Sequence, residues 1–375
     1  MKIELFMSYL MLVLLNLLCG IKRNSAIVKY QKQQIEQKYY NRIKNSTRVF
    51  SALLLVFMII IVVQNRENPD YVNYKWIYES GMQVETGWKY LEELAIREGL
   101  QYDEFKSIVV VISYVILFYG LVKLDVNENI ILAIYAFYPF AMDAIQLRNF
   151  LAMTLVLYAY HFIIRNDKKG KLLFLGLVLI ASTIQSVFPI YLVLLLVNHK
   201  KFNSVRNKLI GVLVICSFIV LVIVKMVPGL VNDIGLLLFE SRSDKVDYYV
   251  QNNVGFGFII FGVMHTLFTL SMYYCGKSKG LLSDKERVLV NSVFWSDLLL
   301  LCMLPLLIIN IEFYRIYRNM CLLNYIALPI LMRGRTTINW MKGCICFVFA
   351  FGLYVAMDYF NYDGRFEYVF IPFFR

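Results

Sequence analysis

The sequence predicts an all-α protein, a polytopic helical bundle built into a membrane. Hydrophobic residues make up 59% of its 375 residues, and a soluble protein with that much apolar surface would aggregate. Several apolar runs reach the roughly 18 to 20 residues that a helix needs to cross a bilayer. No polar stretch is long enough for a separate soluble domain, so we expect a single integral membrane domain over residues 1–375.

About 12 transmembrane segments follow one another along the chain, and some of them are short or re-entrant. The stretch 172–198 is too short for two full crossings at about 1.5 Å per residue, yet basic loops flank it on both sides. We expect a short hairpin there, or two tilted short helices that meet near "STIQS"; the alternative is one long crossing and a different count elsewhere. The expected segments are 5–20, 49–64, 107–122, 130–142, 149–164, 172–184, 186–198, 209–228, 254–275, 288–309, 319–332 and 343–358.

The charges of the connecting loops indicate how these segments are oriented. One set of alternate loops carries 24 Lys and Arg against six Asp and Glu, whereas the other set, with both termini, carries 13 against 19. The positive-inside rule places the first set in the cytoplasm and both termini outside. The net charge of +12 therefore reflects membrane topology, and no nucleic-acid partner is expected. The cytoplasmic loops are 22–48, which could also bind anionic membrane lipid, 123–129, 165–171, 199–208, 276–287 and 333–342.

The long extracytoplasmic loop, 65–106, has helical character. Trp88, Leu91, Leu94 and Ala95 recur in it at helical spacing. Residues 65–105 include nine acids and four bases. Aromatic faces stack on sugar rings and carboxylates accept hydrogen bonds from hydroxyl groups, so this loop suits a carbohydrate ligand. On composition alone, a solvated cap fits equally well.

Three arginines lie at the outer ends of predicted helices. Arg148 stands in "DAIQLRNFLA" between two apolar runs, and Arg315 and Arg318 lie three apart on one helical face in "NIEFYRIYRNM". Each could be a snorkelling or salt-bridged residue, paired with Asp143 or Glu312. Positive charge is disfavoured at the outer membrane edge, so two such sites on one face favour a shared task. That task is anion binding through charge-assisted, bidentate hydrogen bonds.

Nothing in the sequence indicates a metal or a cofactor. No P-loop, G-x-G-x-x-G, HExxH or G-x-S-x-G motif is present, so a nucleotide-driven activity has no visible site. The seven cysteines lie in or at the ends of apolar segments, and we expect them to be small apolar residues rather than disulfide partners or metal ligands. Four polar residues inside the segments are expected to be structurally paired; they are His161, Lys225, His265 and Asp297.

Several short motifs occur in an order that matches a known family. The stretch "RENPDYVNYKWIY" carries Arg66, Asp70, Tyr71 and Tyr74, and "VETGWKYLEEL" carries a Glu-x-Gly-aromatic pattern before a predicted helix. The stretches "IQLRNFLAMTLVLYA", "FYRIYRNM" and the terminal "RFEYVFIPFF" follow in the same order. With these motifs the chain resembles the EpsG family of Wzy-like polymerases for bacterial exopolysaccharide and capsule.

The resemblance spans nearly the whole chain, with two departures. Asn68 stands where the family has a glycine, and in "ASTIQSVFPIYLVLLL" Gln185 stands where the family usually has a histidine. If that histidine is a base, its role is lost or relocated in this chain. Alternatively, the position only orients substrate through hydrogen bonds.

The resemblance implies a fold similar to the O-antigen ligases and, more distantly, to membrane glycosyltransferases of the GT-C type. It implies a multi-pass protein of the bacterial cytoplasmic (plasma) membrane with its active site on the extracytoplasmic side. Such an enzyme transfers a growing glycan from undecaprenyl pyrophosphate to the next lipid-linked repeat unit. The anomeric pyrophosphate bond supplies the energy, so no cofactor is implied. The implied partners are the undecaprenyl-pyrophosphate-linked oligosaccharide, membrane lipid, and other capsule-assembly proteins such as a flippase or a chain-length regulator.

The resemblance and the chemistry of the side chains together predict the site. Preorganised arginines stabilise the negative charge of a leaving pyrophosphate, and a carboxylate accepts or orients the acceptor hydroxyl. The expected catalytic residues are Arg148, Asp70 and Glu85, and the expected substrate-binding residues are Arg315, Arg318, Tyr71, Tyr74, Trp88, Gln185 and Arg66. Two alternatives stay open. One is an O-antigen-ligase-like or other transferase with a polyprenyl-linked donor; the other is a lipid-linked oligosaccharide flippase, against which the lack of internal repeats argues.

Overall fold

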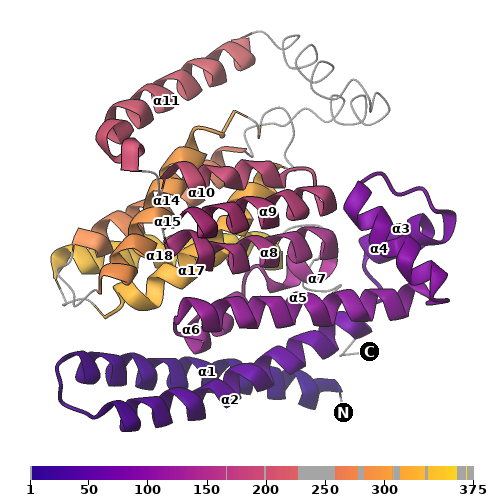
Figure 1. Ribbon diagram of the computed structural model, residues 1–375, viewed down its shortest axis with the longest axis horizontal. Helices are drawn as coiled ribbons and strands as arrows, with labels where there is room; N and C mark the ends of the chain where they lie inside the picture. Colours follow the sequence, from indigo (N-terminus) through magenta and orange to yellow (C-terminus); the bar gives the residue numbers. More distant parts are fainter. Residues whose placement is uncertain are drawn as a thin grey trace.

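Helices make up all the regular structure of the described residues (Figure 1). In the computed structural model, these residues are 2–165, 167–197, 200–226, 258–277, 283–305, 307, 313–333, 337–360 and 369. The helices are α1 (Lys2–Gln31), α2 (Gln37–Gln64), α3 (Pro69–Ser80), α4 (Thr86–Arg97), α5 (Tyr102–Leu124), α6 (Glu128–Tyr135), α7 (Phe140–Ile145), α8 (Leu147–Ile164), α9 (Lys168–Ile184), the 3-10 helix η1 (Phe188–Leu192), α10 (Val193–Val197), α11 (Lys200–Met226), α14 (Phe258–Lys277), α15 (Asp284–Leu301), α17 (Tyr314–Leu331) and α18 (Ile338–Phe360).

Six of the described helices are long and apolar enough to cross a membrane, namely α1, α2, α5, α8, α14 and α18. The all-α, multi-pass class predicted from the sequence is therefore confirmed, and each expected segment overlaps a helix. Helix α9 is slightly shorter than these six, and α15 and α17 begin with charged residues. Charged side chains lower the apolar content of a helix without preventing its burial, provided that they are paired inside the bundle.

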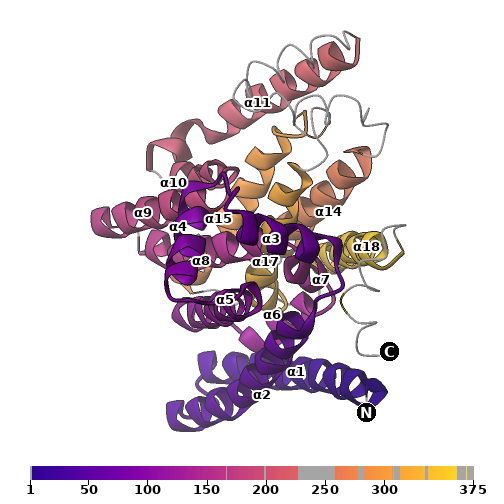
Figure 2. The same cartoon turned by 90° about the vertical axis from the view of Figure 1, so that its right-hand side faces the viewer.

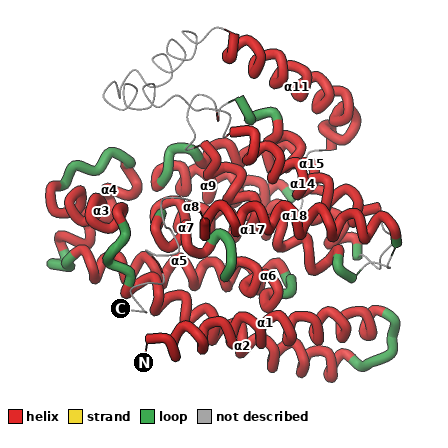
Figure 3. The backbone as a smooth tube through the Cα atoms, turned by 180° about the vertical axis from the view of Figure 1, so that it is seen from behind, coloured by secondary structure: helices red, strands yellow, loops and turns green. Residues whose placement is uncertain are grey.

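Helix α17 lies at the centre of the bundle and is buried along almost its whole length. It packs against α6, α14 and α15, and α14 packs in turn against α18. Helix α8 lies between α5 and α9 (Figure 3). The two helices that carry the candidate arginines, α8 and α17, are therefore held by packing from several sides.

Helices α1 and α2 form a long antiparallel hairpin along one side of the bundle (Figure 1). The sequence predicted a basic loop over 22–48, but both helices continue through most of this stretch, and only residues 32–36 connect them. Both helices extend beyond their apolar runs. The polar side chains in these extensions find partners inside the fold. The basic residues of this region therefore lie mainly on helices.

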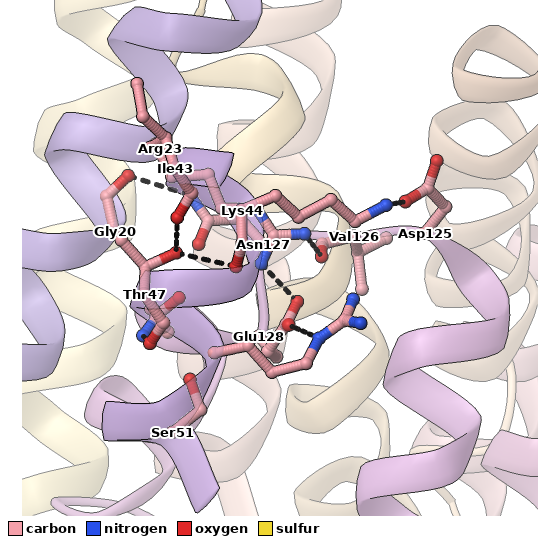
Figure 4. A network of polar contacts seen from close by, with 12 residues as sticks. Gly20, Arg23, Ile43, Lys44, Thr47, Ser51, Asp125, Val126, Asn127 and Glu128 are labelled. Atoms are coloured by element: carbon pink, nitrogen blue, oxygen red, sulfur yellow. Dashed lines mark hydrogen bonds and ion pairs between the residues drawn. The ribbon is translucent and has the colours of Figure 1, made fainter. Parts of the chain in front are cut away.

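Glu128, the first residue of α6, is fully buried and pairs with two arginines of this hairpin (Figure 4). Its carboxylate oxygens lie 2.5 Å from Nη1 of Arg23 on α1 and 2.7 Å from Nε of Arg48 on α2. The neighbouring Asn127 donates a hydrogen bond of 2.8 Å to the carbonyl oxygen of Gly20. A buried charge is tolerated only when it is compensated, so these contacts let polar side chains fasten α6 to the hairpin.

The expected segment 130–142 is broken into α6 and α7 in the structure. Pro139 lies between the two helices. Proline has no backbone N–H group and its ring clashes with the preceding helical turn, so an uninterrupted helix is unfavourable there. After the break, α7 leads through Gln146 directly into α8, which places the first turn of α8 deep in the bundle.

The stretch 172–198 is also divided, at the place where the sequence predicted two short helices to meet. Helix α9 ends at Ile184, and a ten-residue apolar stretch, Phe188–Val197, follows as η1 and α10. Ten helical residues span roughly 15 Å, about half of the hydrocarbon core. The second piece is therefore too short to cross a bilayer by itself.

Helices α3 and α4 lie together at one end of the bundle (Figure 2). They occupy most of the loop 65–106, whose apolar spacing predicted helical structure. Asn68 is the N-cap of α3, and its side-chain oxygen accepts a hydrogen bond of 2.7 Å from the backbone N–H of Tyr71. Asparagine and glycine are both good N-caps, which explains why asparagine fits where the motif has glycine. We call this end of the bundle, where α8 and α17 begin, the arginine end.

Candidate functional site

Arg148 lies in the first turn of α8, at the arginine end. It contacts one residue of α3 and two residues of the connection between α3 and α4. Its Nη1 donates hydrogen bonds to Oε2 of Glu85 at 2.7 Å and to Oε1 of Gln83 at 3.1 Å. The guanidinium carbon lies 4.9 Å from the centroid of the Tyr74 ring. Its Nε makes no hydrogen bond to any described residue. Arg148 is therefore oriented by three groups, and its buried Nε has no partner among the described residues.

Glu85 is held close to Arg148 by the packing of α4 on α9. A Cβ atom at Gly87, in the first turn of α4, would lie only 2.1 Å from Oγ1 of Thr183 near the end of α9. Only glycine permits this approach of the two helices. The Glu-x-Gly motif thus has two parts. The glutamate supplies a carboxylate to Arg148, and the glycine lets α4 approach α9 closely enough to place that carboxylate. Gln185, the C-cap of α9, stands two residues beyond Thr183.

Replacing Gly87 with alanine is expected to destabilise the protein by about 1–3 kcal/mol, the usual cost of overpacking. The added methyl group must push α4 away from α9. Gly176→Ala on α9 is the matched control, because a Cβ there meets nothing within 4 Å and alanine favours a helix more than glycine does. Thermal unfolding of the purified protein measures both effects. Equal Tm values for the Gly87→Ala and Gly176→Ala variants would contradict the close approach.

Arg318, in the first two turns of α17, is completely buried. Its Nη2 donates to Oε1 of Gln146 at 2.8 Å and lies 3.7 Å from Oδ1 of Asp143. Its Nη1 donates to the hydroxyl oxygen of Tyr314 at 3.2 Å. Gln146 is only two residues before Arg148, so the junction of α7 and α8 lies between the two arginines. The structure therefore places the two arginines on either side of this junction; that they share one task stays a prediction.

Asp143 was one possible partner for these arginines; its carboxylate faces Arg318, while Arg148 pairs with Glu85. Asp143 lies on α7, and the turn at Gln146 directs α7 and the start of α8 toward different neighbours. Arg315, one turn before Arg318 on α17, is half-buried. Glu312, the other expected partner, lies outside the described residues. Sequence spacing alone could not reveal this exchange of partners.

A second polar cluster surrounds Asp103, at the start of α5. Its carboxylate lies 3.3 Å from Nη2 of Arg66 and accepts a hydrogen bond of 2.8 Å from the hydroxyl of Tyr71. Burial and the adjacent Asp103 together raise the pKa of Tyr71 to about 12, so the phenol stays protonated and keeps donating. Asp70 precedes Tyr71 on α3 and is half-buried. Asp103 was not predicted as a site residue, because an acidic residue in the first turn of a helix resembles ordinary capping.

Trp88 is not available to hold a sugar, contrary to the sequence prediction. Only 2% of it is exposed, its indole packs edge-on against Phe105 at 5.4 Å, and its Nε1 donates a hydrogen bond of 2.6 Å to Glu92. Burial raises the pKa of Glu92, and the hydrogen bond from Trp88 opposes that shift. The apolar side of α4 thus packs inward, as its spacing of apolar residues allows. Of the expected aromatic contacts, Tyr74 is the one beside Arg148.

Two of the polar residues inside the membrane segments are paired, as the sequence predicted. His265 Nε2 lies 2.9 Å from the carbonyl oxygen of Asp297, and Asn324 donates to Oδ1 of Asp297 at 3.2 Å. All three are buried. The side chain of Lys225 lies outside the described residues. These residues connect α14, α15 and α17 and stand apart from Arg148.

The chain matches one family model, described as the EpsG family, over residues 49–373. The matched range includes both arginine helices, the α3–α4 pair and the Glu-x-Gly motif. It begins within α2 and leaves out most of the α1–α2 hairpin. No curated protein and no solved structure matches the chain.

Proposed function

Since the chain belongs to the EpsG family, we propose that it is a membrane glycosyltransferase that polymerises lipid-linked oligosaccharide repeat units for exopolysaccharide or capsule. In this proposal the growing glycan moves from undecaprenyl pyrophosphate onto the next lipid-linked unit. The reaction takes place at the outer face of the bacterial plasma membrane, where the charge pattern of the loops puts the arginine end. Family membership supports the polymerase class, and the arginine site supports the donor chemistry.

The observation that carries the donor assignment is Arg148 beside Glu85 and Tyr74. A leaving pyrophosphate gains negative charge as its bond to the anomeric carbon breaks, and a preoriented guanidinium stabilises that charge. Arg148 is fixed by Glu85 and Gln83, and its side chain is 17% exposed, so part of it remains accessible to a ligand. Tyr74 lies against the same guanidinium and offers an aromatic surface for the first sugar ring.

The proposed step breaks the bond between the anomeric carbon and pyrophosphate and forms a glycosidic bond, without redox change. The acceptor hydroxyl oxygen attacks the anomeric carbon, and the lipid pyrophosphate departs with the bonding electron pair. The hydroxyl proton passes to a carboxylate, and Glu85 is better placed than Asp70 because Glu85 already contacts Arg148. When the pyrophosphate binds Arg148, the guanidinium can turn partly from Glu85 to the phosphate, which frees the carboxylate to take the proton.

The other predicted residues take supporting parts in this proposal. Arg318 is fully buried, so it positions the α7–α8 junction through Gln146 rather than contacting the lipid pyrophosphate. Arg315 is half-buried on the same helix and is the better candidate for a second phosphate contact. Gln185 cannot act as a base and would orient substrate. Arg66 and Tyr71, held by Asp103, would bind sugars farther from the reacting bond.

Gene deletion followed by gel analysis of the surface glycan tests the proposed function. We expect long chains to disappear while single repeat units still reach the surface, because only chain extension is lost. An unchanged length distribution would contradict the polymerase. Loss of single repeats as well, with lipid-linked units retained outside, would indicate a ligase. Lipid-linked units that accumulate only on the inner leaflet would indicate a flippase.

A reconstituted reaction tests the donor and the chemistry directly. The purified chain, mixed with lipid-linked repeat units, should form a ladder of longer lipid-linked glycans and release undecaprenyl pyrophosphate. Because the anomeric pyrophosphate bond carries the energy and arginines neutralise the phosphate charge, we expect no need for nucleotide and no inhibition by EDTA. A ladder that appears only with added nucleotide, or that EDTA abolishes, would contradict this chemistry.

A further inference from the structure

A cavity of about 150 Å³ opens at the end of the bundle opposite the arginine end. It lies where α5, α8 and α17 end and where α15 begins. Helix α8 runs from Arg148 at one end to the lining residue Arg165 just beyond the other, roughly 25 Å away at the usual helical rise. The cavity is therefore separate from the candidate active site.

Cations from three helices line this cavity, which we call the basic pocket. Lys123 lies in the last turn of α5, His161 and Arg165 lie at the end of α8, and Lys285 lies in the first turn of α15. The positive charges of Lys123, Arg165 and Lys285 all act on the imidazole of His161. The three positive charges therefore lie close to the same half-buried imidazole, where little water is present to screen them.

The two carboxylates that line the basic pocket are each engaged by a cation from outside it. Asp125 pairs with Lys44 of α2. Glu286 lies 2.5 Å from Nη2 of Arg333, and its other oxygen accepts a hydrogen bond from the backbone N–H of Ser283 at 2.8 Å. These contacts leave the pocket with an excess of positive charge. Arg165 shares its charge with the exposed Asp167 at 3.1 Å, outside the pocket lining.

We propose that the basic pocket binds a phosphate group, supplied either by the headgroup of an anionic phospholipid or by free inorganic phosphate. A phosphate presents several oxygens to donors that arrive from different directions, which suits Lys123, Arg165 and Lys285. The cavity, with a volume of about 150 Å³ and an open side, has room for a phosphate group. Its place at the ends of membrane helices puts it near the level of lipid headgroups. The proposal does not depend on polymerase activity.

Ligand-dependent thermal stabilisation of the purified full-length chain in detergent tests this site. Three probes are compared at constant ionic strength: a short-chain phosphatidylglycerol, the phosphatidylcholine of the same chain length, and inorganic phosphate. The pocket variant is Lys123→Gln with Lys285→Gln. The matched control is Lys168→Gln with Lys169→Gln, which removes the same charge from exposed residues of the neighbouring helix outside the pocket.

We expect phosphatidylglycerol to raise the Tm of the unmodified chain and of the control, and phosphatidylcholine to raise neither. The pocket variant should bind roughly tenfold more weakly or worse, since charge-assisted hydrogen bonds to phosphate are lost. Stabilisation by inorganic phosphate as well would identify free phosphate as a ligand, whereas stabilisation by the lipid alone would identify the headgroup. The proposal is overturned if no probe stabilises the chain, or if the pocket variant responds as strongly as the control. If the double variant does not fold, Arg165→Gln replaces it under the same criteria.

Discussion

Replacing Arg148 with alanine should abolish chain growth while the protein still accumulates in the membrane. The proposed reaction creates negative charge on the leaving pyrophosphate, and loss of one preoriented donor to such a charge typically lowers kcat by roughly 100- to 1,000-fold. Arg148→Lys should be almost as inactive, because a single ammonium cannot contact Glu85, Gln83 and a phosphate oxygen together. Glycan length on a gel and turnover of lipid-linked units measure the effect.

Two further variants separate catalysis from simple charge balance at this site. Arg97→Ala is the control, because Arg97 is an exposed arginine on α4 that does not contact the site. Arg148→Ala also leaves Glu85, whose side chain is 10% exposed, without its cation. Arg148→Ala combined with Glu85→Gln removes this unpaired charge together with the proposed base, so we expect it to remain inactive, and only a recovery of activity is informative. Recovery of chain growth in this double variant would show that Arg148 only neutralises Glu85, and the assignment to pyrophosphate would be wrong.

Replacing Glu128 with alanine should destabilise the protein more than Gly87→Ala does. It would leave Arg23 and Arg48 without their shared carboxylate in the interior of the α1–α2–α6 contact (Figure 4). Removing one partner of a buried ion pair costs about 3–5 kcal/mol, a large part of the roughly 5–15 kcal/mol that stabilises a typical domain. The amount of protein in the membrane and the Tm after purification measure the loss.

The neighbouring Asp125→Asn is the matched control, because Asp125 is an exposed carboxylate paired with Lys44 and asparagine tolerates its left-handed backbone. A surface ion pair contributes at most about 1 kcal/mol. A triple variant with Arg23→Met, Arg48→Met and Glu128→Leu should recover much of the lost stability, since apolar side chains can replace a buried charge network. Equal Tm values for Glu128→Ala and Asp125→Asn would show that the network does not hold α6 in place.

The candidate site could be predicted only in part from the sequence. Arg148, Glu85 and Tyr74 were expected at one site, and they are in contact. Gln83, Gln146 and Glu92 were not expected, because an amide or a carboxylate in a polar loop has no distinctive pattern until a partner folds against it. Trp88 was assigned to the substrate because aromatic residues bind sugars, yet the same apolar ring also fills a core. Composition cannot separate these two uses.

By itself, the sequence determined that this is an all-α membrane protein, because an apolar run of sufficient length must form a helix to satisfy its backbone in lipid. It also determined which arginines stand out, because a charge next to an apolar run is unfavourable unless something binds it. Only the tertiary structure decided what binds them: Glu85 and Gln83 for Arg148, Gln146 and Asp143 for Arg318, and Glu128 for Arg23 and Arg48. Those partners come from parts of the chain that are far apart in sequence. Hydropathy is a local property, whereas charge compensation depends on how helices pack.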